Sequence, residues 1–116
     1  MDTVAGLSPE DCPVDRTLRA IGGRWKALIL YYLRSGPQRF NALRRMIPGI
    51  SQRMLTQHLR EMEADGIVTR KVYPVVPPLV EYALSALGVG LMPIFDAMAV
   101  WGGARMAEDR AAKAAA

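Results

Sequence analysis

Residues 48–66, PGISQRMLTQHLREMEADG, predict a helix whose two ends are both marked in the sequence. Ser51 is a strong N-cap, because its hydroxyl can accept a hydrogen bond from a free N–H group of the first turn. Gly66 is a typical C-terminal signal, since glycine readily adopts the left-handed conformation that ends many helices. The apolar residues between these ends share one helical face: Leu55, Leu59 and Met62. The sequence therefore predicts a helix from Ser51 to about Asp65 that buries one face.

A shorter apolar segment lies immediately upstream of this helix. Phe40, Leu43 and Ile47 are spaced as on one helical face, and Pro48-Gly49 breaks the segment. Two helices joined by a tight turn that contains glycine form a helix-turn-helix candidate. A short extended piece is expected before the first of them, after Gly36-Pro37.

Two more helices are expected on the N-terminal side. The first opens at Cys12-Pro13, since proline is favoured at the first helical position, and it ends at Gly22-Gly23. The second carries apolar residues at the spacing of one helical stripe and stops at Gly36-Pro37. These apolar residues are Trp25, Leu28, Ile29, Tyr32 and Leu33.

Residues that favour β-structure replace the helical pattern after Gly66. Residues 67–73 and 79–84 predict the two strands of a hairpin, and residues 74–78, rich in proline, form its tip. A final helix is expected from near Ser85, with a kink at Pro93. Its apolar residues are Leu87, Leu91, Ile94, Phe95, Met98 and Trp101. This order of elements predicts a winged helix-turn-helix domain, which is mainly α with a small β-hairpin (α+β).

The chain has 116 residues, of which 51% are hydrophobic, and this suits one domain with its own core. We divide it into a flexible N-terminal segment (residues 1–11), the domain (residues 12–104) and an Ala-rich tail (residues 105–116). One cysteine and one histidine exclude a self-contained zinc site and a disulfide framework. We therefore expect no metal or other cofactor and a cytoplasmic location.

Neither a membrane span nor a signal peptide is expected. No apolar stretch reaches the roughly 20 residues that a span requires. The longest candidate, Tyr82–Phe95, is too short and contains glycine and proline. Residues 1–11 contain three acids and no basic residue, which is the wrong sign for a signal peptide.

The charges of the chain are strongly segregated along the sequence. Ten of the fifteen basic residues lie between Arg16 and Arg60, and all eleven acids lie outside that window. A basic block beside an acidic remainder is typical of a protein that binds a polyanion. The alternative is a solvated helical surface whose countercharges come from elsewhere in the fold.

Candidate base-reading residues lie opposite the apolar stripe of the helix 51–65. Arginine can reach guanine with two hydrogen bonds, glutamine can reach adenine, and serine or threonine can bond a base or a phosphate. The free N–H groups at the amino end of the helix also favour a phosphate. The acids of this helix, Glu61, Glu63 and Asp65, are expected at its far end, away from the contact. The candidates are Ser51, Gln52, Arg53, Thr56, Gln57 and Arg60.

The shorter helix and the hairpin supply candidates for contacts with the DNA backbone: Arg39, Arg44, Arg45, Arg70, Lys71 and Tyr73. Basic side chains beside the duplex are favoured at phosphates and in the minor groove. For the hairpin residues, an almost equally good interpretation is that they only solvate an exposed strand. The tip at residues 74–78 is uncharged and cannot add ion pairs. His58 borders the buried face, which favours a half-buried structural histidine over a catalytic one.

Taken together, these residues resemble the HxlR-type winged-helix regulators of bacteria, relatives of the MarR group. The resemblance runs from about Cys12 to Trp101. It rests on Cys12-Pro13-Val14, Gly23-Arg24-Trp25-Lys26, Pro48-Gly49-Ile50-Ser51, Leu55-Thr56, Leu59-Arg60-Glu61, Asp65-Gly66, Pro77-Pro78, Val80-Glu81-Tyr82, Leu84, Gly88, Pro93 and Trp101. Two positions depart from the family pattern. Ala42 replaces a usual acid, and Leu79 replaces a basic residue that many members carry, which argues against a wing–phosphate contact at Leu79.

The resemblance implies a homodimeric transcription factor that places two recognition helices in successive major grooves of an inverted repeat. It implies a dimer contact made by the first and last helices, at Leu18, Leu87, Leu91, Phe95, Met98 and Trp101. Some members sense oxidants or electrophiles through a cysteine at the position of Cys12. The alternative for Cys12 is a small apolar residue packed at a helix start.

The leading functional hypothesis is a sequence-specific regulator of transcription, a repressor that binds double-stranded DNA and responds to a small molecule or a redox signal. A small-molecule effector could bind among apolar residues at the dimer seam. The alternative is a winged-helix module that binds another protein, although a docking surface has no need to exclude carboxylates over such a long window. No catalytic motif supports an enzyme.

Overall fold

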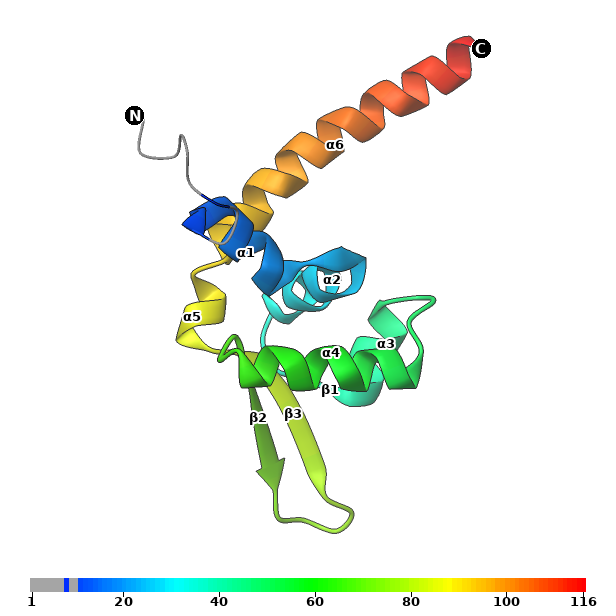
Figure 1. The fold of residues 1–116 in the computed structure, drawn as a ribbon. Coiled ribbons are helices and arrows are strands. Elements are labelled where there is room, and N and C mark those ends of the chain that lie inside the picture. Colours follow the sequence, from blue (N-terminus) through cyan, green and yellow to red (C-terminus); the bar gives the residue numbers. More distant parts are fainter. Residues whose placement is uncertain (1–7, 9–10) are drawn as a thin grey trace.

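The computed structural model describes residue 8 and residues 11–116, and it has the winged helix-turn-helix architecture that the sequence predicts (Figure 1). The proposed flexible segment at residues 1–11 lies outside the described residues, apart from residues 8 and 11. The elements are α1 (Pro13–Ile21), α2 (Gly23–Leu33), β1 (Gln38–Arg39), α3 (Phe40–Met46), α4 (Gln52–Ala64), β2 (Val68–Tyr73), β3 (Leu79–Leu84), α5 (Ala86–Val89) and α6 (Met92–Ala115).

Helix α4 begins and ends at the two residues that the sequence indicates. The Ser51 hydroxyl accepts a hydrogen bond from the backbone N–H of Met54 at 3.1 Å. Gly66 has a φ of 76°, and its N–H donates to the Glu63 carbonyl while the Ile67 N–H donates to the Met62 carbonyl. This pair of bonds is a Schellman motif, which satisfies the last carbonyl groups of the helix.

The turn between α3 and α4 depends on Gly49. Its φ is 94°, a conformation that costs other residues steric strain, and the indole of Trp25 lies 3.6 Å from where a Cβ atom would be. The buried residues beneath this turn and along α2 and α4 form one core with the sheet. They are Ile21, Ile29, Leu30, Leu33, Leu43, Ile47, Ile50, Leu55, Leu59, Met62, Ile67, Val68 and Phe95.

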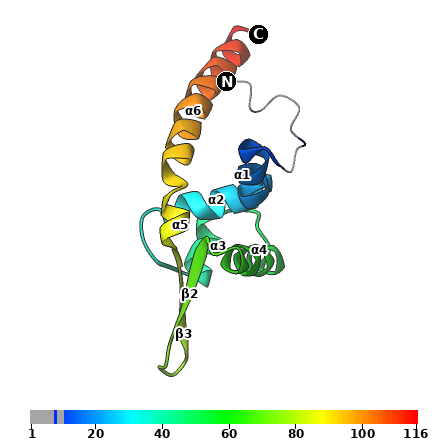
Figure 2. The same ribbon diagram turned by 60° about the vertical axis from the view of Figure 1, so that its left-hand side comes forward.

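A small antiparallel sheet, with strand order β1-β3-β2, carries the wing. The short β1 pairs with β3 next to α3, so the base of the wing lies beside the helix-turn-helix. Strands β2 and β3 pair from Val68↔Leu84 to Tyr73↔Leu79, and the hairpin projects away from the helices (Figures 1 and 2).

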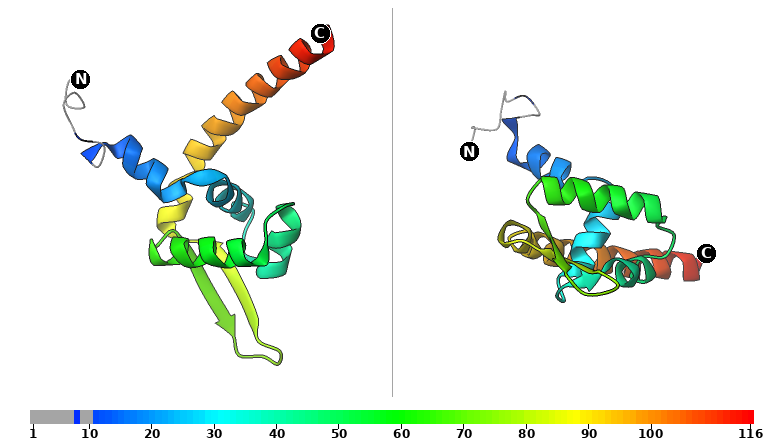
Figure 3. Two further views of the ribbon diagram at one scale, coloured as in Figure 1. Left: turned by 45° about the vertical axis from the view of Figure 1, so that its right-hand side comes forward. Right: turned by 90° about the horizontal axis from the view of Figure 1, so that it is seen from below.

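The C-terminal region differs from the single kinked helix that the sequence suggests. The chain forms the short α5 and then, after Gly90 and Leu91, the separate α6, in which Pro93 occupies the first turn. Proline is tolerated there because the first N–H groups of a helix have no intrahelical partner, so Pro93 starts a helix and does not bend one. Helix α6 continues without interruption past residue 104 to Ala115, and it extends away from the body (Figure 3).

The helical stretch Ala86–Ala115 corrects the expectation that no segment is long and apolar enough for a membrane span. It contains an 18-residue window of mean hydropathy 1.4 that meets this test by length and composition, and only 11% of that window is buried. One such helix is weak evidence for a membrane span, because the core helix of a soluble protein passes the same test of length and composition. In this stretch, Asp96 forms an ion pair with Arg34, the C-cap residue of α2, and Phe95 lies in the core of the domain.

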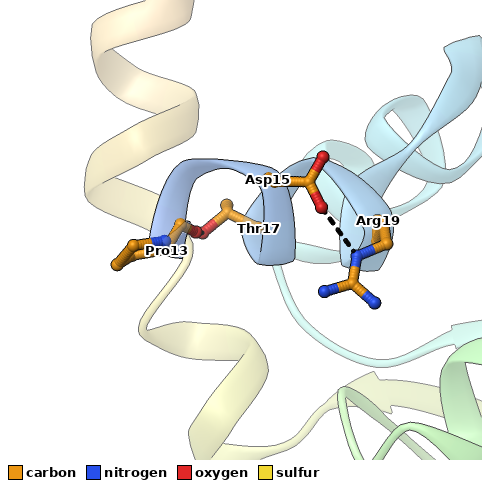
Figure 4. A network of polar contacts seen from close by, with 4 residues as sticks. All are labelled: Pro13, Asp15, Thr17 and Arg19. Carbon is orange, nitrogen blue, oxygen red and sulfur yellow. Dashed lines mark hydrogen bonds and ion pairs between the residues drawn. The ribbon is translucent and has the colours of Figure 1, made fainter. Parts of the chain in front are cut away.

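Helix α1 is held by local polar contacts on its outer side (Figure 4). The Arg19 Nε atom lies 3.0 Å from the Asp15 carboxylate, and the Thr17 hydroxyl donates to the Pro13 carbonyl at 2.9 Å. Pro13 occupies the first helical turn, as the sequence predicts.

Candidate nucleic-acid interface

The exposed face of α4 is opposite its buried stripe, as its periodicity predicts. Leu55, Leu59 and Met62 are buried in the core. Thr56 is half-buried at the border of the face, and the other candidates for base contacts are exposed: Ser51, Gln52, Arg53, Gln57 and Arg60. All of these except Ser51 line one shallow groove along α4. The structure therefore brings the hydrogen-bonding side chains of this helix together on one accessible surface.

Glu61 lies in this groove, which corrects the expectation that the acids of α4 are away from it. Glu61 follows Gln57 by four residues, so one helical turn places both side chains on the same face. Its Oε1 atom lies 3.7 Å from Lys26 Nζ and 3.4 Å from His58 Nδ1. The spacing of four residues between Gln57 and Glu61 is the signal in the sequence that predicts Glu61 on this face. His58 itself is half-buried, as predicted.

A second groove lies between α3 and the part of β3 that adjoins the wing tip. It is lined by Arg39 and Arg45 on one side and by Pro78 and Leu79 on the other. Asn41, which the sequence did not single out, lines this groove and also a neighbouring hollow with Arg44 and Arg45. An exposed asparagine between arginines gives this surface both hydrogen-bonding capacity and positive charge.

The wing carries its positive charge on the first strand. Arg70 and Lys71 are exposed, and the Lys71 Nζ atom lies 4.8 Å from the centre of the Tyr73 ring. Lys71 and Arg39 both lie opposite Glu81 in the sheet register, and neither is among the ion pairs of the described residues. Arg70 is opposite Tyr82, which leaves its charge without a direct cross-strand acid.

The fold supplies countercharges to only part of the basic window. Arg19 pairs with Asp15, Lys26 with Glu61, and Arg34 with Asp96. Among the described residues, no ion pair engages the five arginines of α3, α4 and the strand before them: Arg39, Arg44, Arg45, Arg53 and Arg60. Of the other basic residues in this window, Arg16 and Arg24 also form none of these ion pairs, so most but not all of the unpaired charge of the window lies on the helix-turn-helix and the strand before it.

Of the residues expected at a dimer contact, most are accessible and one is not. Leu18, Leu87, Met98 and Trp101 are exposed, and Leu91 is half-buried against the core. Phe95 is only 3% exposed, and its ring packs edge-on against Tyr31 of its own chain. The expectation that Phe95 contacts a partner is therefore wrong. Phe95 lies one helical turn after Leu91, so both side chains face the domain, and α2 covers the Phe95 ring.

Cys12 is the N-cap residue of α1 and is half-buried with a free thiol. Its side chain makes no capping hydrogen bond.

Comparison with known proteins identifies the family of this domain. The family model described as HxlR-like helix-turn-helix matches residues 20–110. The chain belongs to this family. The B. subtilis protein named uncharacterized HTH-type transcriptional regulator YybR is 55% identical over 93 residues, which are 80% of this chain and 74% of the relative. The B. subtilis regulator YkvN is 51% identical over 79% of this chain and 78% of its own.

Solved structures support the same assignment. The redox regulator HypR in its reduced form has a TM-score of 0.79 and 52% identity, over 82% of this chain and 94% of that one. Its oxidized form has a TM-score of 0.77 and 54% identity, over 80% and 96%. The diamide-treated form of YodB from B. subtilis is more distant, with a TM-score of 0.68 and 39% identity, over 79% and 92%.

The family resemblance and the fold class predicted from the sequence are thereby confirmed. The chain is a helix-turn-helix transcriptional regulator and not an enzyme, as its family and relatives show.

Proposed function

We propose that this HxlR-family regulator binds double-stranded DNA in a sequence-specific manner and represses transcription, with α4 as the recognition helix. The observation that carries the proposal is the groove on α4, which gathers Gln52, Arg53, Thr56, Gln57 and Arg60 on one exposed surface. Arginine and glutamine at this surface can each form bidentate hydrogen bonds with a purine in the major groove.

The unpaired arginines of β1 and α3 supply the sequence-independent part of the binding. Arg39 and Arg45 line the groove between α3 and the wing, and Arg44 lines the neighbouring hollow, so all three can neutralise phosphates beside the recognition helix. Further DNA contacts are proposed for Ser51 at the start of α4 and for the wing residues Arg70, Lys71 and Tyr73; Tyr73 is half-buried and the other three are exposed.

The regulator acts as a homodimer in this proposal. Exposed apolar side chains on α1, α5 and α6 favour a second copy as the partner, because isolated patches of this kind usually mark an interface. On α6, Met98 and Trp101 line one apolar hollow with Pro93, Ile94, Ala97 and Gly102. A two-fold dimer binds an inverted repeat whose half-sites are about one helical turn, ~34 Å, apart. We expect the protein to act in the cytoplasm on chromosomal DNA.

The decisive test is to sequence the genomic DNA fragments that the purified protein retains. The proposal expects a small set of fragments that share an inverted repeat, with their retention abolished by Arg53→Ala. Retention of fragments without any shared sequence, or of none, would favour the protein-interaction alternative. Reporter expression from a promoter that carries the repeat then distinguishes repression from activation.

We further propose that Cys12 makes the regulator responsive to oxidants. The support is its half-buried free thiol at the start of α1 and the similarity to solved structures described as a redox regulator and as a diamide-treated regulator. Diamide would take two electrons and two protons from the thiols of two Cys12 residues in the dimer, which would form one S–S bond while its N=N bond is reduced to a hydrazine. A mixed disulfide with a small thiol follows the same balance.

Oxidation of Cys12 in this scheme alters the start of α1 and therefore the spacing of the two recognition helices. The test is operator affinity before and after diamide treatment, for the native protein and for Cys12→Ser. The proposal expects a change in the native protein alone. Equal affinities throughout would leave Cys12 as a packing residue, and a change in both proteins would point to another target of the reagent.

A further inference from the structure

His58 is the only histidine of the chain, and it lies on α4 between two residues of the groove proposed to face DNA, Gln57 and Arg60. Its side chain is 22% exposed, and its Nδ1 atom is buried. No hydrogen bond from the described residues reaches this atom, although the Glu61 Oε1 atom lies 3.4 Å away. Buried polar atoms without a hydrogen bond are rare, so this titratable ring beside an acid is a candidate for a functional role.

Protonation of His58 would change the charge of this part of the groove. The neutral ring has one nitrogen that accepts a hydrogen bond and one that donates, whereas the doubly protonated ring donates from both and carries a positive charge. Glu61 lines the groove, and its Oε1 atom also lies 3.7 Å from the Lys26 ammonium. One carboxylate oxygen is therefore shared by a lysine and by a histidine, and only the histidine ordinarily changes its charge between about pH 5 and pH 8.

The other charged side chains around α4 do not take part in this cluster. Helices α2 and β2 pack against α4, and α1 approaches its C-terminal end at Asp65. No ion pair of the described residues joins His58 or Glu61 to the remaining charged groups of these elements. These groups are Arg53, Arg60, Glu63 and Asp65 on α4, Arg24 on α2, Asp15, Arg16 and Arg19 on α1, and Arg70 and Lys71 on β2.

We propose that His58 is a positioning residue for DNA binding, and that its protonation pairs it with Glu61 and makes the affinity for DNA rise as the pH falls. The inference rests on the proposed DNA binding by α4 and adds a regulation of that same surface. The proton comes from the solvent and stays on the imidazole, so the ring gains one positive charge. This charge reduces the repulsion between Glu61 and the phosphates. Because protonation favours binding, binding must in turn take up protons.

A pH series of DNA titrations tests the proposal, since the chain has no second histidine. The probe is a rhodamine-labelled, mixed-sequence duplex of about 30 base pairs, which offers two successive major grooves. In anisotropy titrations at low salt, the affinity of the full-length protein should rise about fivefold for each bound subunit between about pH 7.5 and pH 5.5. Calorimetry in two buffers of different ionisation enthalpy should show net proton uptake on binding near about pH 6.5.

Variants separate protonation from a purely structural role. His58→Gln keeps a polar side chain that has no charge at any of these pH values, so its affinity should not change with pH and its proton uptake should fall to near zero. Glu61→Gln removes the carboxylate and should flatten the pH profile. Lys26→Met leaves Glu61 dependent on His58 alone, so its profile should become steeper. Arg110→Ala, on the exposed end of α6, is the control and should keep the native profile.

The outcomes distinguish the inference from the function on which it rests. If the native protein binds the duplex equally well at all pH values, or if His58→Gln keeps the native profile, the role of His58 is wrong and DNA binding by α4 stands. If His58→Gln weakens binding by the same factor at every pH, His58 is only structural and the inference is wrong. Should His58→Gln not fold, the Glu61→Gln profile and the proton uptake of the native protein decide instead. If the native protein binds no duplex at any pH, the proposed function fails as well.

Discussion

Glu61 of α4 and Lys26 of α2 form an ion pair, with 3.7 Å between the carboxylate Oε1 and the ammonium Nζ. Glu61 is the one acid among the residues that line the groove on α4, where DNA phosphates would approach. The Lys26 side chain is mostly covered, so it compensates Glu61 from behind the groove and is not itself placed to contact a phosphate. The ion pair therefore reduces the repulsion between the Glu61 carboxylate, on the exposed face of α4, and the DNA phosphates.

This relationship predicts opposite effects for its two members. Lys26→Met keeps the apolar stem but leaves Glu61 uncompensated, so duplex affinity should fall by about 1 kcal/mol at low salt. Glu61→Gln removes the negative charge and should tighten binding by a similar amount. The double variant should bind like Glu61→Gln alone, because Lys26 acts through Glu61, and a double-mutant cycle of anisotropy titrations measures this non-additivity. Additive effects would show that the pair has no role in DNA affinity.

The arginines of α3 should act on all DNA sequences alike. Arg44→Ala and Arg45→Ala should each lower the affinity for specific and scrambled duplexes by a similar factor and reduce the salt slope by about 1. Titrations at several salt concentrations measure both quantities. Arg110→Ala, on the exposed end of α6, is the control and should change neither. A loss confined to one sequence would assign Arg44 or Arg45 to base reading.

Substitutions at Phe95 and Trp101 of α6 should affect different properties: the first should lower the stability of the fold, and the second should weaken the dimer. Phe95 is buried in its own chain, so Phe95→Ala should reduce the free energy of unfolding by about 3–5 kcal/mol. Trp101 is 72% exposed, and Trp101→Ala should leave the monomer folded and weaken the dimer at least tenfold. Chemical denaturation and sedimentation measure the two effects. A native protein that sediments as a monomer at micromolar concentration would exclude the proposed dimer.

Gly88 and Gly103 provide a matched pair of glycines in the last two helices. A Cβ atom on Gly88 would collide with the Ile67 carbonyl, whereas nothing lies within 4 Å of one on Gly103. Gly88→Ala should therefore destabilise the domain by about 1–3 kcal/mol, because α5 must move away from Ile67, the residue before β2. Gly103→Ala should instead stabilise it by about 0.5–1 kcal/mol, because alanine loses less entropy in a helix. Thermal unfolding compares the two variants, and equal stabilities would contradict this packing.

Much of the fold, and most of the residues on the exposed face of α4, could be predicted from the sequence because they depend on local signals. Ser51 and Gly66 mark the ends of α4 by capping chemistry, and the spacing of its leucines fixes which side is exposed. Several features that the sequence did not reveal depend on tertiary contacts. The sequence shows that Phe95 is apolar but not that α2 covers it, and it shows that Glu61 is acidic but not that Lys26 approaches it. The break between α5 and α6, just before Pro93, likewise depends on how these helices pack against the rest of the domain.

The base-reading role of α4 is tested most directly by Arg53→Ala and Gln57→Ala on the retained inverted repeat and on a scrambled duplex of the same composition. The account predicts that each variant loses about 1–3 kcal/mol of affinity for the repeat, with little change for the scrambled duplex, so that specificity falls while general binding remains. Unchanged affinity of both variants for the repeat, or equal losses on the two duplexes, would contradict the assignment of α4 as the recognition helix.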